Sequence, residues 1–129
     1  MTIQVLGTLV VNNQRKALTT YDYEWALKST LGEAGGDPSN AWEWGAVLWT
    51  MLHRWAGNYG RAGESFGEYV QRFSQPVNPN QIGKIHSYDK TAEDPSGLVR
   101  SQERDNRIRT LRARPVADIE QRHPALASY

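Results

Sequence analysis

The sequence contains no cysteine among its 129 residues. A thiol nucleophile, a cysteine-ligated zinc site and a disulfide framework are therefore excluded, and any chemistry must come from oxygen and nitrogen groups. The absence of cysteine does not indicate whether the protein resides in an oxidising or a reducing compartment. His53, His86 and His123 are far apart and lack the spacing of metal ligands, so we expect no metal site, and we expect no cofactor.

Long apolar runs are also lacking. No stretch approaches the roughly 20 residues of a membrane span, and the start at Met1 has neither the basic nor the apolar region of a signal peptide. We therefore expect a soluble chain that carries no export signal of its own. A chain of 129 residues can bury a core as one domain without metal or disulfide support.

The residues that are present predict a mainly helical fold behind a short extended segment. Residues 1–20 are expected to form an arm or an edge strand, because apolar residues alternate over 2–11 before a turn at Asn12 and Asn13. Residues 21–129 are expected to form a single helical domain. Within this domain we expect a helical core over 21–80, a long loop over 75–97 with few apolar anchors, and C-terminal helices over 98–123. The core helices are predicted near 21–33, 38–55 and 65–74, and Ser65 with Glu68 forms the capping box that starts the third. The second of these is apolar nearly all round, which is typical of a buried central helix.

One carboxylate stands out at the end of the first predicted helix. Glu33 lies just before Gly35 and Gly36, which stop the helix and would leave an opening of bare backbone beside the acid. Cleavage of a glycosidic bond needs an acid that delivers a proton to a poor leaving oxygen. Glu33 is the best-placed candidate for this general acid. The alternative is an ordinary hydrated residue at a helix end.

No second acid is a convincing partner for Glu33. Asp37 is expected to cap a helix, Glu43 to occupy an exposed helical position, and Glu64 to be a loop charge. A lytic transglycosylase needs one acid only, because the same group can then take the proton of the sugar's 6-hydroxyl as an anhydro ring closes. A single glutamate therefore favours transglycosylation over hydrolysis, although both stay open.

Three segments together resemble the SleB-type cell-wall hydrolases. They are LGEAGGDP at 31–38, AVLWTMLHR at 46–54, and the run from Ser65 to Pro76 with its SF, YV and FSQP pieces. The run from 74 to 79 is also similar to phage virion proteins with lytic transglycosylase domains. The resemblance covers about 23–79 of the chain. It departs at His53, where asparagine is usual, and at Leu31, where tyrosine is common.

The resemblance implies a lysozyme-like helical fold and cleavage of the glycan strand of peptidoglycan between N-acetylmuramic acid and N-acetylglucosamine. The family's catalytic glutamate falls on Glu33 and its helix-two arginine on Arg54. It further implies a phage-encoded enzyme, present in the virion or the host cytoplasm after synthesis and acting at the bacterial cell wall or periplasm. Peptidoglycan and a virion or tail assembly are the partners that it suggests.

Five side chains are candidates for contact with the glycan. They are Ser74, Gln75, Asn78, Tyr88 and Trp44. The first two leave the third predicted helix where polar groups could line a cleft beside the acid, and the next two follow in the loop. Most tryptophans are expected in the core, but one of Trp42 and Trp44 must point away from it, and we assign Trp44 as a platform for a sugar ring.

A basic run near the C-terminus supports an alternative without catalysis. Between 104 and 114 the chain has five arginines and one acid; the arginines are Arg104, Arg107, Arg109, Arg112 and Arg114. Such a run is ordinarily a solvated helix face. It could also dock a virion structural protein or bind nucleic acid through phosphate contacts. Salt-sensitive nucleic-acid binding without glycan cleavage would favour this alternative.

Overall fold

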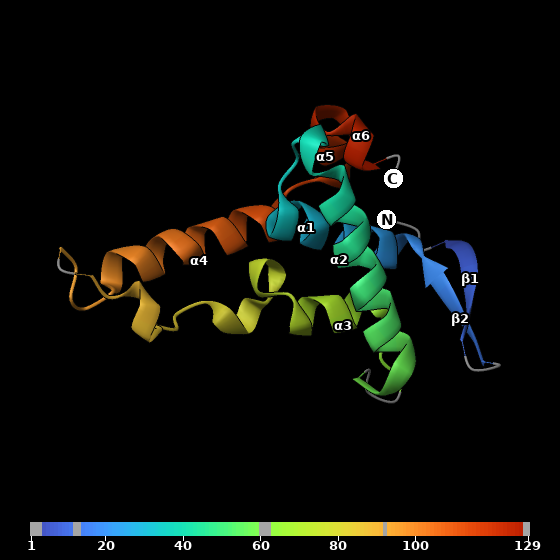
Figure 1. Ribbon diagram of the computed structural model, residues 1–129, viewed down its shortest axis with the longest axis horizontal. Coiled ribbons are helices and arrows are strands. Elements are labelled where there is room, and N and C mark those ends of the chain that lie inside the picture. The colour runs from blue at the N-terminus through green and yellow to red at the C-terminus, as the bar shows by residue number, and fades with distance from the viewer. Residues whose placement is uncertain (1–3, 12–13, 60–62, 92, 128–129) are drawn as a thin grey trace.

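The computed structural model describes residues 4–11, 14–59, 63–91 and 93–127, and it is mainly helical (Figure 1). The main elements are β1 (Val5–Val11), β2 (Gln14–Thr19), α1 (Thr20–Ala34), α2 (Ala41–Arg54), α3 (Phe66–Phe73), α4 (Leu98–Ala113), α5 (Val116–Arg122) and α6 (Pro124–Ala127). A π-turn (Trp55–Tyr59) extends α2, and short 3-10 turns lie at Pro38–Asn40, Gln75–Val77, Pro79–Gln81 and Ser87–Asp89. No helix within the described ranges is long and apolar enough to cross a membrane.

The N-terminal segment is a β-hairpin rather than a single strand. β1 pairs antiparallel with β2, from Val5 opposite Thr19 to Val11 opposite Gln14. β1 falls within the strand that alternating apolar residues predict, whereas β2 is an addition that the sequence reasoning missed. The predicted turn at Asn12 and Asn13 lies outside the described residues. Figure 1 shows the hairpin projecting from the helices at one end of the molecule.

The hairpin leads directly into α1. A buried carboxylate near the start of α1, that of Asp22, connects this helix to α3. Thr19 caps α1, and Asp22 accepts hydrogen bonds from the Thr19 amide at 2.8 Å and from the Gly67 amide at 2.7 Å. α3 begins after Ser65, whose hydroxyl accepts from the Glu68 amide at 3.1 Å, as the capping pattern predicts. The Asp22 carboxylate thus connects the start of α1 to α3.

Two clusters of buried side chains form the core. The larger one joins α1, α3 and the turns on either side of α3; its buried members are Trp25, Trp55, Ala56, Phe66, Tyr69, Val70 and Val77. The smaller cluster lies where α5 and α6 cover the corner between α1 and α2; its buried members are Leu27, Ala34, Trp44, Ile119 and Leu126. Both clusters use α1, which is therefore the central helix of the fold.

The prediction that the second helix is the buried centre is wrong. Within α2 only Trp44 is fully buried, while Trp42 is 71% exposed and Trp49 is 63% exposed. The helix also begins later than predicted, because Asp37 caps a 3-10 turn at Pro38–Asn40 before α2 starts. α2 packs one face on α1 and leaves its other side in solvent, although both sides are apolar.

Residues 75–97, predicted as a long loop with few apolar anchors, are held against α4 by polar side chains. The Ser101 hydroxyl donates to the Lys84 carbonyl at 2.9 Å, and the Asp105 carboxylate accepts from the Gly83 amide at 3.1 Å. Arg104 forms an ion pair with Asp89 at 2.6 Å. Figure 1 shows α4 and this segment side by side in an arm that extends from the body. The sequence did not indicate these contacts, because they are made by polar side chains of the helix that follows.

Candidate active site

Glu33 occupies the last turn of α1, where the helix was predicted to end. Its side chain is exposed, and its Oε1 accepts a hydrogen bond from the Ser74 hydroxyl at 3.1 Å. Ser74 is 3% exposed and marks the end of α3. The structure thus places Ser74, at the chain exit after α3, in contact with Glu33.

A second hydroxyl holds Ser74 in turn. Ser29 lies one turn before Glu33 on α1, is buried, and donates to the Ser74 oxygen at 2.7 Å. The Ser29 oxygen also lies 3.5 Å from the Met51 sulfur, which is a weaker acceptor. The result is a directed chain from Ser29 through Ser74 to Oε1 of Glu33. Among the described residues, Oε2 of Glu33 has no hydrogen-bond partner, so this oxygen is available to an outside group.

The glycines around Glu33 allow close packing rather than leave an opening. A Cβ on Gly32 would lie 2.5 Å from the Cβ of Pro76 and 2.9 Å from a methyl of Leu111. A Cβ on Gly36 would lie 2.2 Å from the ring of His123, which follows α5. The expected gap of bare backbone beside the acid is thus filled on both sides. Gly32 instead brings α1, the Gln75–Val77 turn and α4 together.

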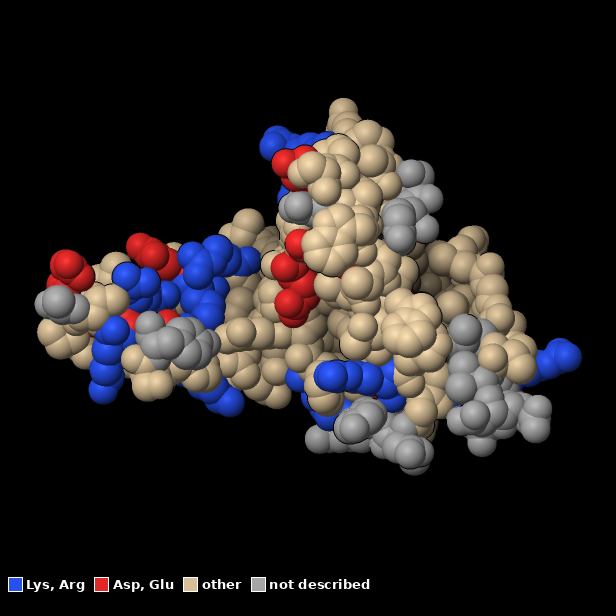
Figure 2. All heavy atoms as spheres, viewed as in Figure 1, with Lys and Arg blue, Asp and Glu red and all other residues tan. Residues whose placement is uncertain are grey.

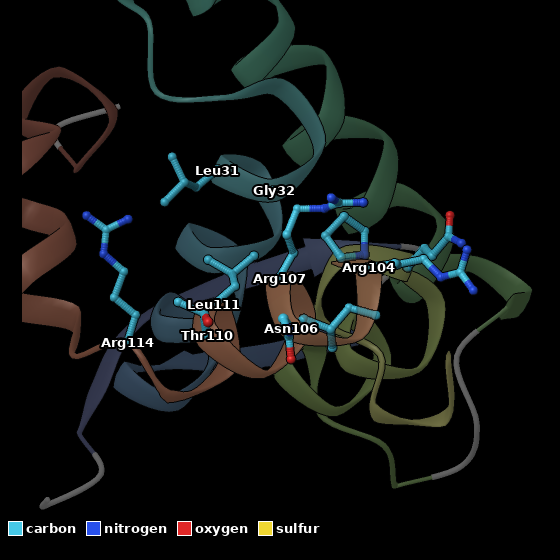
Figure 3. A pocket seen from close by; sticks show the side chains of 11 residues that line it. Leu31, Gly32, Arg104, Asn106, Arg107, Thr110, Leu111 and Arg114 are labelled. Atoms are coloured by element: carbon cyan, nitrogen blue, oxygen red, sulfur yellow. The ribbon is translucent and has the colours of Figure 1, made fainter. Parts of the chain in front are cut away.

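A groove begins directly beside this contact. It has a volume of about 700 Å³ and runs between the end of α1, the turn after α3, and α4. Its apolar lining comes from Leu31, Pro76, Ile108 and Leu111. Figure 3 shows these elements converging, with the arginines of α4 around the groove. Gly32, which precedes Glu33 in the chain, lines this groove, whereas Glu33 is not among its lining residues.

The other predicted contact residues have different surroundings. Gln75 is exposed and lines the groove. The Asn78 amide is buried, donates to the Arg72 carbonyl at 2.9 Å and accepts from the Asn80 amide at 2.9 Å, so its polar atoms hold the turn backbone. The side chain of Tyr88 lies outside the described residues; its backbone belongs to the Ser87–Asp89 turn.

Trp44 cannot serve as the sugar platform that we assigned to it. It is 1% exposed, and its indole nitrogen donates to the Gly35 carbonyl at 2.9 Å. The expected division between the pair does hold, with Trp42 as the exposed member. The reason is that the apolar pattern surrounds α2, so the sequence does not indicate which tryptophan faces α1.

The five arginines do not form one basic surface. Arg104 is buried and binds Asp89 and the Lys84 carbonyl, while Arg112 donates to the Val77 carbonyl and lies 4.7 Å from the centre of the Trp25 ring. Burial lowers the pKa of Arg112 from its usual value. Arg114 pairs with Asp118 at 2.7 Å.

Arg107 and Arg109 remain exposed and have no acidic partner within the described ranges. Figure 2 shows Lys and Arg side chains gathered over the arm that contains α4, with some acidic side chains among them and others nearer the middle of the same face. The arginines between 104 and 114 therefore have two different environments. Some members hold the arm together, and others face solvent.

Asp37, Glu43 and Glu64 are not suited to act as a second catalytic acid. Asp37 accepts from the Ser39 amide at 3.0 Å, and this hydrogen bonding lowers the pKa of the Asp37 carboxyl. Glu64 binds Arg72 through both oxygens at 2.9 Å. Glu43 is half-buried in the first turn of α2. Within the described residues no cluster of side chains could hold a metal ion.

Arg54, the helix-two arginine of the resemblance, is exposed at the end of α2 with its guanidinium 5.9 Å from the centre of the Phe73 ring. The sequence reasoning overlooked Ser29. Its position four residues before Glu33 placed it on the same helix face, which was the available signal. Its hydroxyl partner comes from another helix, so the hydrogen bond itself could not be predicted.

No protein-family model, no curated protein and no solved structure matches the chain.

Proposed function

We propose that this protein cleaves the glycan strand of peptidoglycan with Glu33 as its single catalytic acid, as a lytic transglycosylase. The observation that carries the proposal is the directed chain from Ser29 through Ser74 to Oε1 of Glu33. A surface glutamate needs no buried hydroxyls to orient it, whereas a general acid does, because its proton must meet the leaving oxygen at hydrogen-bond distance. The resemblance of residues 23–79 to cell-wall hydrolases agrees with this role.

In this proposal the two carboxyl oxygens of Glu33 have different roles. Ser74 holds Oε1, and Oε2 carries the proton. As the glycosidic bond breaks, this proton passes to the leaving oxygen. The ionised Glu33 then takes the proton of the muramic acid 6-hydroxyl, and that oxygen bonds to C1 to close the anhydro ring. The proton count balances with no second acid and no water.

The test is digestion of purified peptidoglycan by the wild type and by Glu33→Gln, with mass spectrometry of the released fragments. The wild type should release anhydro-ended muropeptides, and the variant should release none. Glu103→Gln, an exposed acid on α4, is the matched control and should keep full activity. Reducing ends in place of anhydro ends would indicate hydrolysis instead. No release by a folded wild type would refute the enzyme proposal.

A second candidate is a non-enzymatic virion or nucleic-acid-associated protein. The exposure of Arg107 and Arg109 on α4 favours it. The internal contacts of Arg104 and Arg112 weaken it, because these two side chains are already committed to the fold. Binding to DNA that falls steeply with salt, in the absence of any glycan cleavage, would support this candidate over the first.

A further inference from the structure

The outer face of α2 carries a row of exposed side chains, which we call the α2 stripe. It consists of Trp42, Ala46, Trp49 and His53, at intervals of four, three and four residues, so the four lie on one side of the helix. Trp42 is 71% exposed and Trp49 is 63% exposed. Figures 1 and 2 show α2 on the face turned toward the viewer, with none of the labelled elements in front of it. Exposed indoles in a row are typical of an interface.

The α2 stripe is ordered at its C-terminal end. The rings of Trp49 and His53 are stacked, with 3.9 Å between their centres. Nδ1 of His53 lies 2.8 Å from the Trp49 carbonyl oxygen, to which it donates a hydrogen bond. The Trp49 indole is therefore held in place before any partner arrives, and its burial in an interface costs little side-chain entropy.

The order of large and small side chains makes the α2 stripe complementary to itself. When two such stripes run antiparallel, the centre of the pair falls between residues 47 and 48. Ala46 then faces Trp49 of the second copy, and Trp42 faces His53 of the second copy. Each indole meets a methyl group or a flat ring. In a parallel pair each of the four residues would face its own copy, and the indoles would compete for the same space.

The charges beside the α2 stripe favour the same orientation. Glu43 lies in the first turn of α2 and Arg54 in the last. They are eleven residues apart, close to three turns, so both flank the stripe on the same side. A two-fold axis that pairs the helices antiparallel brings Glu43 of each copy beside Arg54 of the other. Figure 2 shows acidic atoms beside the upper part of α2 and basic atoms near its lower end. A parallel pair would place like charges together.

We propose that the α2 stripe is the interface of a two-fold symmetric dimer of this chain, in which the two α2 helices run antiparallel. The two indoles together supply on the order of 300 Å² of surface per copy. A standard interface buries about 800 Å² per partner, so the dimer is a weak one. We expect its dissociation constant to be on the order of 10–100 μM. The inference does not depend on glycan cleavage.

The test is sedimentation equilibrium of the full chain from about 5 to about 500 μM, a range that spans the expected constant. The wild type should change from monomer to dimer over this range. Trp49→Ala should weaken association at least about tenfold, because a central interface tryptophan is a typical hot spot. Val99→Ala is the matched control, since it shortens an exposed apolar side chain at the start of α4, and it should leave association unchanged. Circular dichroism at the lowest concentration verifies that each variant is folded.

A charge exchange tests the orientation. Glu43→Arg and Arg54→Glu should each weaken association about tenfold, because each places two like-charge pairs at the interface. The double variant restores both opposite-charge pairs and should recover association to within about twofold of the wild type. In a parallel pair each single change would only replace one like-charge contact with another.

Three results would overturn the inference. They are a wild type that stays monomeric up to about 500 μM, a dimer that Trp49→Ala weakens no more than Val99→Ala does, and a double charge variant that associates as weakly as the single ones. A fourth result would reassign the α2 stripe. If chitotetraose shifts the tryptophan fluorescence of a monomeric wild type, and fails to do so in Trp49→Ala, the stripe binds sugar in place of a second copy.

Discussion

The Ser74 hydroxyl donates a hydrogen bond to Oε1 of Glu33 at 3.1 Å and thereby connects the end of α3 to the end of α1. Ser29 donates to the same hydroxyl, so Ser74 directs its own proton toward the carboxylate. An exposed glutamate would otherwise sample several rotamers. The hydrogen bond from Ser74 therefore restricts the orientation of the Glu33 carboxylate.

Replacement of Ser74 with alanine should therefore lower the rate of glycan cleavage without abolishing it. The loss of one hydrogen bond to a charged group corresponds to about 1.5 kcal/mol, or a fall of about tenfold in the rate of anhydro-muropeptide release. Glu33→Gln should remove the activity entirely. Ser29→Ala should have a smaller effect than Ser74→Ala, because it acts on Glu33 only through Ser74.

A loss of activity in Ser74→Ala could also come from unfolding, so the melting temperature is measured in parallel. A variant with the wild-type melting temperature and a reduced rate supports the positioning role. An unchanged rate in a folded Ser74→Ala would contradict it, and would leave the Ser74 contact as a structural one.

The close approach at Gly32 gives a second prediction. A methyl group there would overlap Pro76 and Leu111, both of which belong to packed elements. We expect Gly32→Ala to lower the free energy of unfolding by about 1–3 kcal/mol, the range for overpacked sites, as measured by urea denaturation. Gly7→Ala is the matched control, since a Cβ on Gly7 meets nothing within 4 Å. Equal stability of the two variants would show that the three elements can separate at little cost.

Local signals in the sequence predicted much of the helical core. The end of α1 near Glu33 follows from the glycines that come after it, and the start of α3 follows from the cap at Ser65. These features depend on residues within a few positions of each other. The chemistry of caps and helix stops is therefore visible without knowledge of the tertiary fold.

The errors share a different physical origin. Trp44 and Trp42 are two positions apart on a helix that is apolar on both sides, and only the packing of α1 on α2 selects which one is buried. Arg104 and Arg112 look like surface charges until the carbonyls and rings that they bind are known. Contacts between distant segments decide these cases, and one sequence carries no direct record of them.

The carboxylate of Asp22 gives a stability prediction for the helical core. It is buried and accepts amide hydrogen bonds from Thr19 and Gly67, which join the hairpin, α1 and α3. Asp22→Ala would leave these donors unpaired, and each unsatisfied buried donor costs about 1–3 kcal/mol. We expect the free energy of unfolding to fall by at least about 2 kcal/mol in urea denaturation.

Glu103→Ala removes an exposed carboxylate of α4 and should change the stability by less than about 0.5 kcal/mol. A similarly small change for Asp22→Ala would mean that water or a shifted backbone replaces the lost acceptor, and it would remove Asp22 from the account of how α1 and α3 are joined.

The ion pair between Asp89 and Arg104 predicts how the arm of α4 responds to acid. The side-chain hydrogen bond from Arg104 is the main cause that lowers the pKa of Asp89 below its usual value, and the His86 amide adds a further hydrogen bond. A carboxyl with a lower pKa in the folded state stabilises the protein above its unfolded pKa of about 4. This stabilisation is lost as the pH falls through the folded pKa. Between pH 7 and pH 2, the free energy of unfolding should therefore fall more steeply for the wild type than for Asp89→Asn.

The difference between the two proteins is the informative quantity, because other carboxyls titrate in both. Asp94 and Asp118 also have lowered pKa values, through hydrogen bonds from Ser96 and Arg114, and their contributions cancel in the comparison. The wild type should be the more stable protein at pH 7, and the gap should narrow below about pH 4. If the difference in the free energy of unfolding stays constant down to pH 2, the charge of Asp89 does not contribute to stability. The attachment of residues 75–97 to α4 would then rest on the contacts of Ser101 and Asp105.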